Sequence, residues 1–337
     1  MTHATAFTRM SKMTGLLVAG GVFGAVAASA LATSVAPAPA QALDACFSSA
    51  LTGTLKTGSA SCSSSGPVQW AIAIGVNTTA EVGGGLFNLA IAVGADSVAL
   101  VTGDADSYFN IATAAAGGFA RASNGIFQIA TARGSQPDDG TGAFATNGSF
   151  GVARAIGVNA FSRAGAEGDL AQASAFNIAV ARGENSAAVA RNGFGNSSRA
   201  FGSGAIAITE FGNGNIARAL GNGAEAEAGG NNPADQSSFN VARAVGSTSN
   251  ARAGAFGGDL TESNFNIATV IGNESTASAG QGNLNTARVF GDTSTAEAGP
   301  GNGRRAIVIG SNQMKSDPPE GASARRAAAS VRSPAQR

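Results

Sequence analysis

Histidine, lysine and aromatic side chains are scarce in this chain of 337 residues. The single histidine is His3, and no lysine lies between Lys56 and Lys315. Without another histidine the chain cannot build a Ser-His or Cys-His relay or the usual zinc site, and without a central lysine it cannot carry a P-loop. Only 12% of residues are charged and 6% aromatic, which argues against ordinary helices and sheets around a bulky core. We therefore expect no enzyme activity, no metal site and no cofactor.

Net positive charge is also missing, because 21 basic residues are balanced by 21 acidic ones. A nucleic-acid-binding protein usually carries a basic face, so we expect no nucleic-acid partner. Charge is segregated along the chain, however. Positions 303–337 include Lys315, Arg325, Arg326, Arg332 and Arg337 and are basic, whereas positions 43–302 are net acidic. The basic end is interpreted as a solvated tail, and attachment to an anionic envelope polymer is the alternative.

The N-terminus has the pattern of a secretory signal peptide. Arg9 and Lys12 precede an uncharged apolar run from Leu16 to Leu31, and Ala40-Gln41-Ala42 matches an A-x-A cleavage site. We expect export, cleavage after Ala42, and a secreted or cell-surface protein with no transmembrane span after cleavage. An uncleaved membrane anchor is the alternative, although the run is shorter than the ~20 residues of a typical span.

The only cysteines, Cys46 and Cys62, both follow the expected cleavage point. In an exported protein a close, even pair of cysteines is most simply a disulfide. We therefore predict a Cys46–Cys62 disulfide.

Glycine and alanine are abundant, and one eight-residue phrase recurs from Val68 to Gly310. Examples are FNLAIAVG at 87, FNVARAVG at 239 and FNIATVIG at 265, in eleven copies spaced 18 to 26 residues apart except for one gap of 38. We place a degenerate copy, GSGAIAIT at 202, in that gap. A second phrase, such as NESTASAG at 273–280, runs between copies, and both alternate with the period of two that is typical of strands. The sequence thus predicts an all-β parallel β-solenoid (β-roll or β-helix) of about eleven to twelve two-strand repeats, with a disordered C-terminal tail.

The repeat columns predict which side of each strand is buried. The fourth position is alanine in all eleven copies, whereas the alternate face carries Phe and Ile together with arginines. Stacked arginines cannot lie unpaired in a thin core, so we place alanine inside and the Phe/Ile/Arg face outside as an interaction surface. In the alternative arrangement, Phe and Ile fill the interior and arginine extends past the turn. The candidate interaction face comprises Phe176, Ile216, Arg218, Phe239, Val241, Arg243, Phe265, Ile267 and Arg288.

The second position of the phrase is mostly asparagine. Identical asparagines stacked at the strand spacing of about 4.8 Å can form a structural amide ladder, with a polar binding stripe as the alternative. The ladder comprises Asn88, Asn110, Asn177, Asn215, Asn240, Asn266 and Asn285.

These patterns divide the chain into four parts. Residues 1–42 are the signal peptide, 43–67 a cysteine-containing N-terminal cap, 68–310 the Ala/Gly-rich β-solenoid repeats, and 311–337 a basic disordered tail.

The repeats AIAIGVNTTAEVGGG (71–85), AIAVGADSVALVTG (90–103) and IGNESTASAG (271–280) resemble the haemagglutinin-like head repeats of trimeric autotransporter adhesins, which have a YadA-type β-roll. The resemblance covers roughly residues 68–310 and implies a left-handed parallel β-roll, a trimer and binding to host matrix or cell surfaces. The repeats here are longer, and neither a C-terminal coiled coil nor a barrel anchor is evident. With its signal peptide, the chain looks more like actinobacterial secreted proteins of uncharacterised function.

Taken together, the sequence predicts a non-catalytic secreted or cell-surface structural, adhesion-like protein that uses the solenoid as a binding platform. Its expected partners are further copies of the chain, an envelope polymer or a host-surface ligand. The alternative is a carbohydrate-active right-handed β-helix enzyme, which would need carboxylates at one column of neighbouring turns.

Overall fold

The computed structural model describes residues 44–66, 68–134, 140–166, 174–230, 237–254 and 263–317. The expected signal peptide and residues 318–337 of the expected tail lie outside these ranges. In the described part, the chain forms two β-sheets, of fourteen strands (sheet A) and thirteen strands (sheet B).

From β4 in sheet A and from β3 in sheet B, the spatial order of the strands follows the sequence, and successive strands alternate between the sheets. At the N-terminal edge β2 and β1 both belong to sheet A, in the order β2-β1-β4. Sheet A comprises β2 (Gly53–Thr57), β1 (Ala45–Ser49), β4 (Gln69–Ile74), β6 (Asn88–Val93), β8 (Ile111–Ala115), β10 (Ile129–Arg133), β12 (Val152–Ile156), β14 (Ile178–Arg182), β16 (Ser197–Ala200), β18 (Ile216–Ala219), β20 (Val241–Arg243), β22 (Ile267–Ile271), β24 (Thr286–Phe290) and β26 (Arg305–Ile309). Sheet B comprises β3 (Ser61–Ser64), β5 (Thr79–Gly83), β7 (Val98–Thr102), β9 (Phe119–Ile126), β11 (Gly142–Ser149), β13 (Phe161–Ala164), β15 (Ala187–Ala190), β17 (Ile206–Thr209), β19 (Glu225–Ala228), β21 (Asn250–Ala253), β23 (Thr276–Ala279), β25 (Thr295–Ala298) and β27 (Met314–Asp317).

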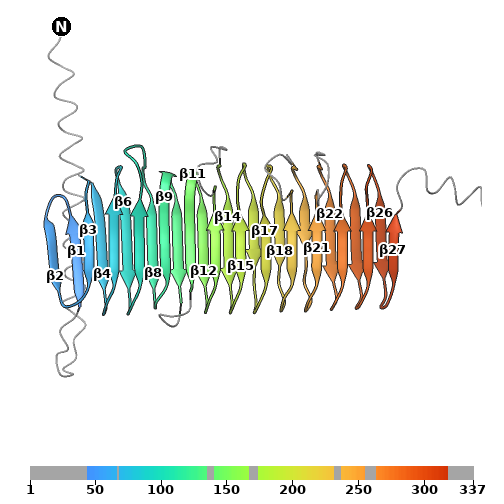
Figure 1. Cartoon of the computed structure of the whole chain (residues 1–337), viewed down its shortest axis with the longest axis horizontal. Helices are drawn as coiled ribbons and strands as arrows, with labels where there is room; N and C mark the ends of the chain where they lie inside the picture. Colours follow the sequence, from blue (N-terminus) through green and yellow to red (C-terminus); the bar gives the residue numbers. More distant parts are fainter. Residues whose placement is uncertain are drawn as a thin grey trace, which may run out of the picture. The chain divides into compact units, whose positions relative to one another are not determined.

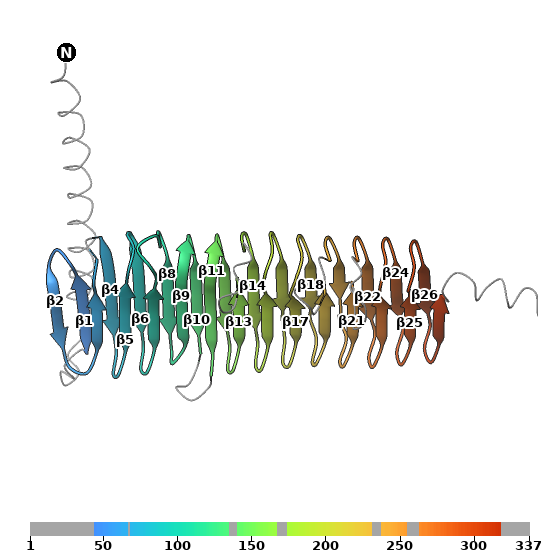
Figure 2. The ribbon, with the colours of Figure 1, turned by 45° about the horizontal axis from the view of Figure 1, so that its top comes forward.

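Each turn of the chain contributes one strand to sheet A and one to sheet B, as Figures 1 and 2 show. From β4 in sheet A and from β3 in sheet B, successive strands of a sheet pair in parallel. Repeat positions align, as Ala217 pairs with Ala242 and Arg218 with Arg243. The protein is therefore an all-β parallel β-solenoid of about twelve turns, as the repeat pattern predicted. A single turn has too little apolar surface to be stable alone, so stability comes from stacking on its neighbours.

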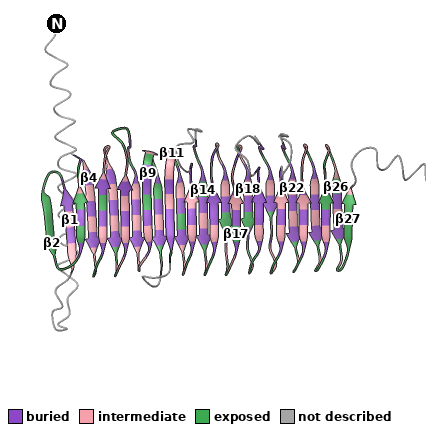
Figure 3. Ribbon diagram, in the orientation of Figure 1, coloured by how far each residue is buried: buried purple, intermediate pink, exposed green. Residues whose placement is uncertain are grey.

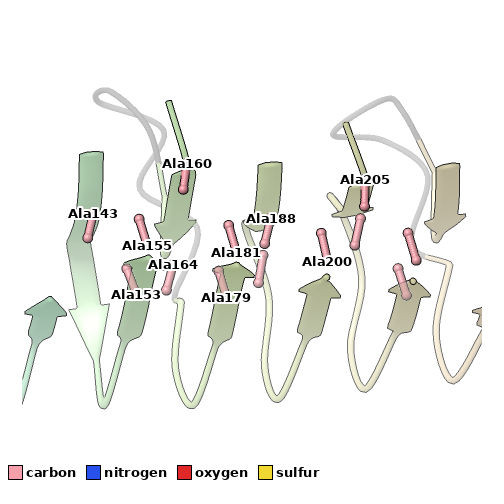
Figure 4. Packing of buried hydrophobic residues seen from close by; sticks show 14 of the residues in the cluster. Ala143, Ala153, Ala155, Ala160, Ala164, Ala179, Ala181, Ala188, Ala200 and Ala205 are labelled. Carbon is pink, nitrogen blue, oxygen red and sulfur yellow. The ribbon is translucent and has the colours of Figure 1, made fainter. Parts of the chain in front are cut away.

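Alanine fills the space between the two sheets. Ala71, Ala90, Ala217 and Ala242 of sheet A, and Ala226 of sheet B, are each 0% exposed. Figure 3 shows buried and less buried residues alternating along the strands, and Figure 4 shows alanine side chains from both sheets in the interior. Because the inner side chains are this small, the interior has no room for Phe or Ile, and the arrangement in which they fill the core is excluded.

The 38-residue gap in the repeat pattern contains a complete solenoid turn. The repeat pattern placed the sheet A strand of this turn at the wrong phrase. The sheet A strand of this turn is β16, from the phrase FGNSSRAF at 194, and it pairs with β14 and β18. The phrase at 202, which we expected to be the degenerate copy, instead contains β17 of sheet B. The pattern was missed because Ser197 and Ser198 replace the usual apolar residue and alanine.

The N-terminal end of the solenoid is closed by an antiparallel hairpin. Strands β1 and β2 pair with each other, and β1 also pairs antiparallel with β4. The Cys46–Cys62 disulfide is present, and it joins β1 of sheet A to β3 of sheet B with a Cα–Cα distance of 5.7 Å. The sheets start earlier and end later than residues 68–310, since β3 and β27 are paired strands of sheet B and residues 314–317 belong to it rather than to a tail.

We find no helix in the described part of the chain with the length and apolarity needed to cross a bilayer.

Candidate interaction face

The asparagine column forms a buried ladder at the turn that leads into sheet A. The Oδ1 of Asn215 accepts the backbone N–H of Asn240 at 3.0 Å, and the Oδ1 of Asn240 accepts that of Asn266 at 3.0 Å. The side-chain amides mostly donate to backbone carbonyls, as Asn240 does to Ser263 at 2.8 Å. The ladder therefore differs from the stacked side-chain amides we expected, because most rungs are joined by side-chain-to-backbone bonds. These bonds satisfy buried backbone groups, so the column is structural.

The ladder also includes positions that the repeat comparison left out. Asn196, in the missed turn, accepts the N–H of Asn215 at 3.0 Å. At Gly151 the asparagine is absent, and the longer Gln128 of the preceding turn fills the space: a Cβ at Gly151 would lie 2.1 Å from the Gln128 side-chain oxygen. The exception thus has a packing explanation.

Phenylalanines immediately before the asparagine column form an outward row, which we call the phenylalanine row. Each has a left-handed backbone, with φ close to +58°. The same column is occupied by Gly195, Gly214 and Gly303, which have φ between +65° and +72°. A bulky residue in this conformation costs ~1–2 kcal/mol, whereas glycine adopts it freely. The phenylalanine row comprises Phe87, Phe109, Phe127, Phe150, Phe176, Phe239 and Phe265.

The other turn of each repeat also has a left-handed position. It is filled by Asn or Asp in several turns, as at Asn77, Asp96 and Asn159, which tolerate the conformation, and by Thr or Glu in others, as at Thr248 and Glu274. In the described turns it is never filled by an aromatic residue. Backbone strain of this kind concentrates at functional positions. The phenylalanine row is therefore the feature of the solenoid that packing requirements explain least.

The phenylalanine rings stack along the solenoid with their edges toward solvent. Neighbouring rings from Phe87 to Phe176 have centroids 4.7–5.0 Å apart and planes within 10° of parallel, and the Phe239–Phe265 pair is stacked in the same way. From Phe109 onward the members of the row are 41% to 54% exposed. Ring faces cover one another, so the row presents ring edges, which carry the positive end of the aromatic quadrupole.

Beside the phenylalanine row lie the outward side chains of β4 to β26, and together they form what we call face A. Its members include all the residues expected in the interaction face: Ile216, Val241 and Ile267 are half-buried in one column, Arg218 and Arg243 are exposed in the next, and Arg288 is half-buried. The far column adds further exposed apolar side chains, Val93, Leu220, Ile271, Phe290 and Ile309. The far column also carries Arg133 and Arg182, and the central column carries Arg154, Arg199, Arg218, Arg243 and Arg288. Face A thus has an apolar phenylalanine rim, a centre with five arginines, and a far rim that is mostly apolar.

The two sheets differ in charge. Within the described residues, no strand of sheet A contains Asp or Glu, whereas sheet B mixes both signs. The charged residues in strands of sheet A are Lys56, Arg133, Arg154, Arg182, Arg199, Arg218, Arg243, Arg288 and Arg305. Those in strands of sheet B are Arg121, Arg163, Arg252, Lys315, Glu81, Glu225, Glu227, Glu297 and Asp317.

Three carboxylates on the sheet B side lie on two neighbouring turns. Glu225 and Glu227 lie in β19, and Glu210 follows β17 and forms an ion pair with Arg191 at 3.4 Å. Burial raises the pKa of Glu210 above its ordinary value, although the Arg191 guanidinium acts in the opposite direction. The three carboxylates occupy three different columns, so they lack the single-column register that a polysaccharide-cleaving site would need. In the described part, no cluster of three or more His, Cys, Asp or Glu residues is arranged to hold a metal.

A surface depression lies elsewhere on the sheet B side. It has a volume of about 460 Å³, and it is lined mainly by glycine and apolar side chains, including Val98, Phe119, Phe144 and Phe161. Asp96 is its one carboxylate. A single acid beside phenylalanines supplies no general acid–base pair.

Comparisons with protein families, with curated proteins and with solved structures find no significant match to this chain.

Proposed function

We propose that this protein is a non-catalytic, secreted or cell-surface structural protein of the adhesion-like kind, and that its solenoid is a rigid binding platform. The observation that carries the proposal is the phenylalanine row, which keeps exposed aromatic side chains in a costly backbone conformation turn after turn. In-register stacking fixes these side chains and the adjoining arginines in straight columns, which suits recognition of an extended surface. The disulfide favours an oxidising, extracellular location.

The proposal is tested by adsorption of the purified chain to isolated bacterial cell envelopes and to collagen-coated surfaces. We expect saturable retention on at least one of them and weaker retention of a variant with Arg199, Arg218 and Arg243 changed to Gln. Absence of retention on both surfaces would contradict the proposal. Light scattering after size-exclusion chromatography tests the trimer implied by the adhesin resemblance.

A carbohydrate-active enzyme is the second candidate, because Glu210, Glu225 and Glu227 lie on two adjacent turns of the sheet B side, although they do not share one column. Incubation with an acidic polysaccharide such as polygalacturonate distinguishes the two. New reducing ends that disappear in a Glu210→Gln or Glu225→Gln variant would establish the enzyme and refute the structural role.

A further inference from the structure

Face A combines two properties that rarely occur together on a solvent-exposed surface. It carries eight arginines with no carboxylate on any sheet A strand in the described part, and it exposes apolar side chains along both rims. Arg199, Arg218 and Arg243 stand on three successive turns in one column, at the strand spacing of about 4.8 Å. Like charges at this spacing repel, so a binding partner of opposite sign would stabilise them.

We propose that face A binds the surface of an anionic lipid bilayer. This proposal rests on the proposed platform function and names what the platform binds. The phenylalanine row and the apolar residues of the far column enter the boundary between headgroups and acyl chains, and the arginines of the central and far columns contact headgroup phosphates. Arginine suits this position because its long stem lies along apolar surface while its guanidinium reaches the phosphate.

The dimensions of face A fit a flat partner. Its twelve strands from β4 to β26 span about 50 Å at the usual strand spacing, and a five-residue strand is about 17 Å long. An amphipathic surface binds a bilayer in proportion to its buried apolar area and to its attraction for anionic lipids. Face A offers apolar side chains along its length and arginines from β10 to β26, whereas the strands of sheet B carry acids among their bases.

A soluble anionic polymer explains less of face A. Sugar rings stack on aromatic faces, but most faces of the phenylalanine row are covered by neighbouring rings at 4.7–5.1 Å, and only the end rings of the two stacked runs, such as Phe239 beside Gly214, have a face without a stacked ring. A polar polymer would also leave the exposed apolar rims, such as Leu220 and Ile309, without a partner. The polymer accounts for the arginines alone.

A second copy of the chain is also a poor partner for face A. Parallel copies placed face to face would set arginine against arginine. Antiparallel copies would bury the arginines against the apolar strands β4, β6 and β8, where no carboxylate compensates them. An uncompensated buried charge opposes association in both arrangements.

Vesicle co-sedimentation of the full chain tests the proposal. We expect binding to vesicles of phosphatidylglycerol and phosphatidylcholine, little binding to phosphatidylcholine alone, and a decrease in affinity as NaCl is raised. The salt series uses only the wild-type chain and therefore does not depend on the folding of any variant. Failure to bind anionic vesicles at low salt would overturn the proposal.

Two triple variants separate the basic and apolar contributions. Replacement of Arg199, Arg218 and Arg243 by Gln should weaken partitioning into anionic vesicles by about 100-fold. Replacement of Phe127, Phe150 and Phe176 by Gly should weaken it by about tenfold or more and keep the fold, because Gly195 and Gly214 already occupy this column. The matched control replaces Arg121, Arg163 and Arg252 of sheet B by Gln and should bind as wild type does.

The remaining outcomes identify other partners. Equal affinity for dextran sulfate and for vesicles, unchanged by the Phe→Gly replacements, would overturn the bilayer in favour of an anionic polymer. A dimer that dissociates in the Arg→Gln variant would overturn it in favour of self-association. Residues 1–43 are common to every variant, so differences between variants report on the two faces. The platform function can survive failure of vesicle binding, since retention on envelopes or collagen is measured separately.

Discussion

The two sheets share one interior but have different exteriors. Both bury alanine at alternate positions of their strands, as Ala217 in β18 and Ala226 in β19 illustrate. Outside, sheet A bears basic residues without acids and adjoins the strained phenylalanine row, whereas sheet B mixes Glu225 and Glu227 with Arg163 and Arg252. A core that requires only small side chains leaves the outer positions free to vary. The contrast between the exteriors therefore carries the functional information.

The turns that enter the two sheets offer the first comparison and the largest expected effect. Asn240→Ala removes the acceptor of the Asn266 N–H and the donor to the Ser263 carbonyl, and it leaves a void. We expect a loss of about 3 kcal/mol in the free energy of unfolding. Ser275→Ala, at the turn into sheet B, leaves a smaller void and should cost about 1–2 kcal/mol. Urea unfolding of both variants checks the order, and equal losses would contradict it.

Because the two sheets share one alanine-filled interior, enlarging a buried alanine should destabilise the fold equally in either sheet. Ala217→Leu and Ala226→Leu each add methylene groups where the opposite sheet leaves no space, so each should cost ~1–3 kcal/mol. Arg218→Ala and Arg243→Ala change exposed positions and should stay within ~0.5 kcal/mol. Thermal unfolding of the four variants tests this, and tolerant alanines with sensitive arginines would mean that the strand faces are reversed.

A phenylalanine of the row and a phenylalanine of sheet B should respond oppositely to replacement by glycine and by alanine. Phe150 has φ of +57°, so Phe150→Gly should be more stable than Phe150→Ala by about 1 kcal/mol. Phe161 lies within strand β13, where glycine is less favourable, so Phe161→Ala should be more stable than Phe161→Gly by ~0.5–1 kcal/mol. Chemical denaturation of the four variants gives both differences. If the glycine variant is more stable than the alanine variant at both sites, or less stable at both, the claim that the row is strained is refuted.

The smallest expected effect is a pH dependence on the sheet B side. Burial raises the pKa of Glu210 above its ordinary value of 4.5. Between pH 4.5 and the raised pKa, the folded state therefore holds a proton that the unfolded state has released. Its contribution to stability is therefore complete below pH 4.5 and decreases as pH rises through the raised pKa. Glu210→Gln should remove this decrease. Unfolding free energies of wild type and variant, measured from pH 4 to 8, should diverge over that window, and parallel curves would contradict the assignment.

The sequence predicts the solenoid well because the alanine columns and the period-two alternation report directly on stacking. It predicts less where the pattern weakens. Strand β16 was missed because Ser197 and Ser198 interrupt the columns, and β3 and β27 were left outside the array because SCSS and MKSD lack its alanines. The missing alanines are physically reasonable, since the ends of a stack have only one neighbouring turn to pack against.

The candidate site was only partly predictable. The outward position of Arg218 and Arg243 follows from the cost of burying charge, and that argument needs no coordinates. The left-handed backbone at Phe150 does not follow from the repeat, because a column of letters gives no φ. The sequence indicates the left-handed backbone only through the glycines that replace phenylalanine in this column, such as Gly214. The charge difference between the sheets likewise required the assignment of every strand to one sheet.

The emission of the only tryptophan tests the central claim most directly. Trp70 lies in β4 on face A and is half-buried, and sheet B and residues 1–43 contain no tryptophan that could obscure its signal. Addition of anionic vesicles should shift Trp70 emission to shorter wavelength and make it sensitive to quenching by brominated acyl chains, with both effects reversed by high salt. Vesicle-bound protein with unchanged, unquenched Trp70 emission would show that face A is not the binding surface.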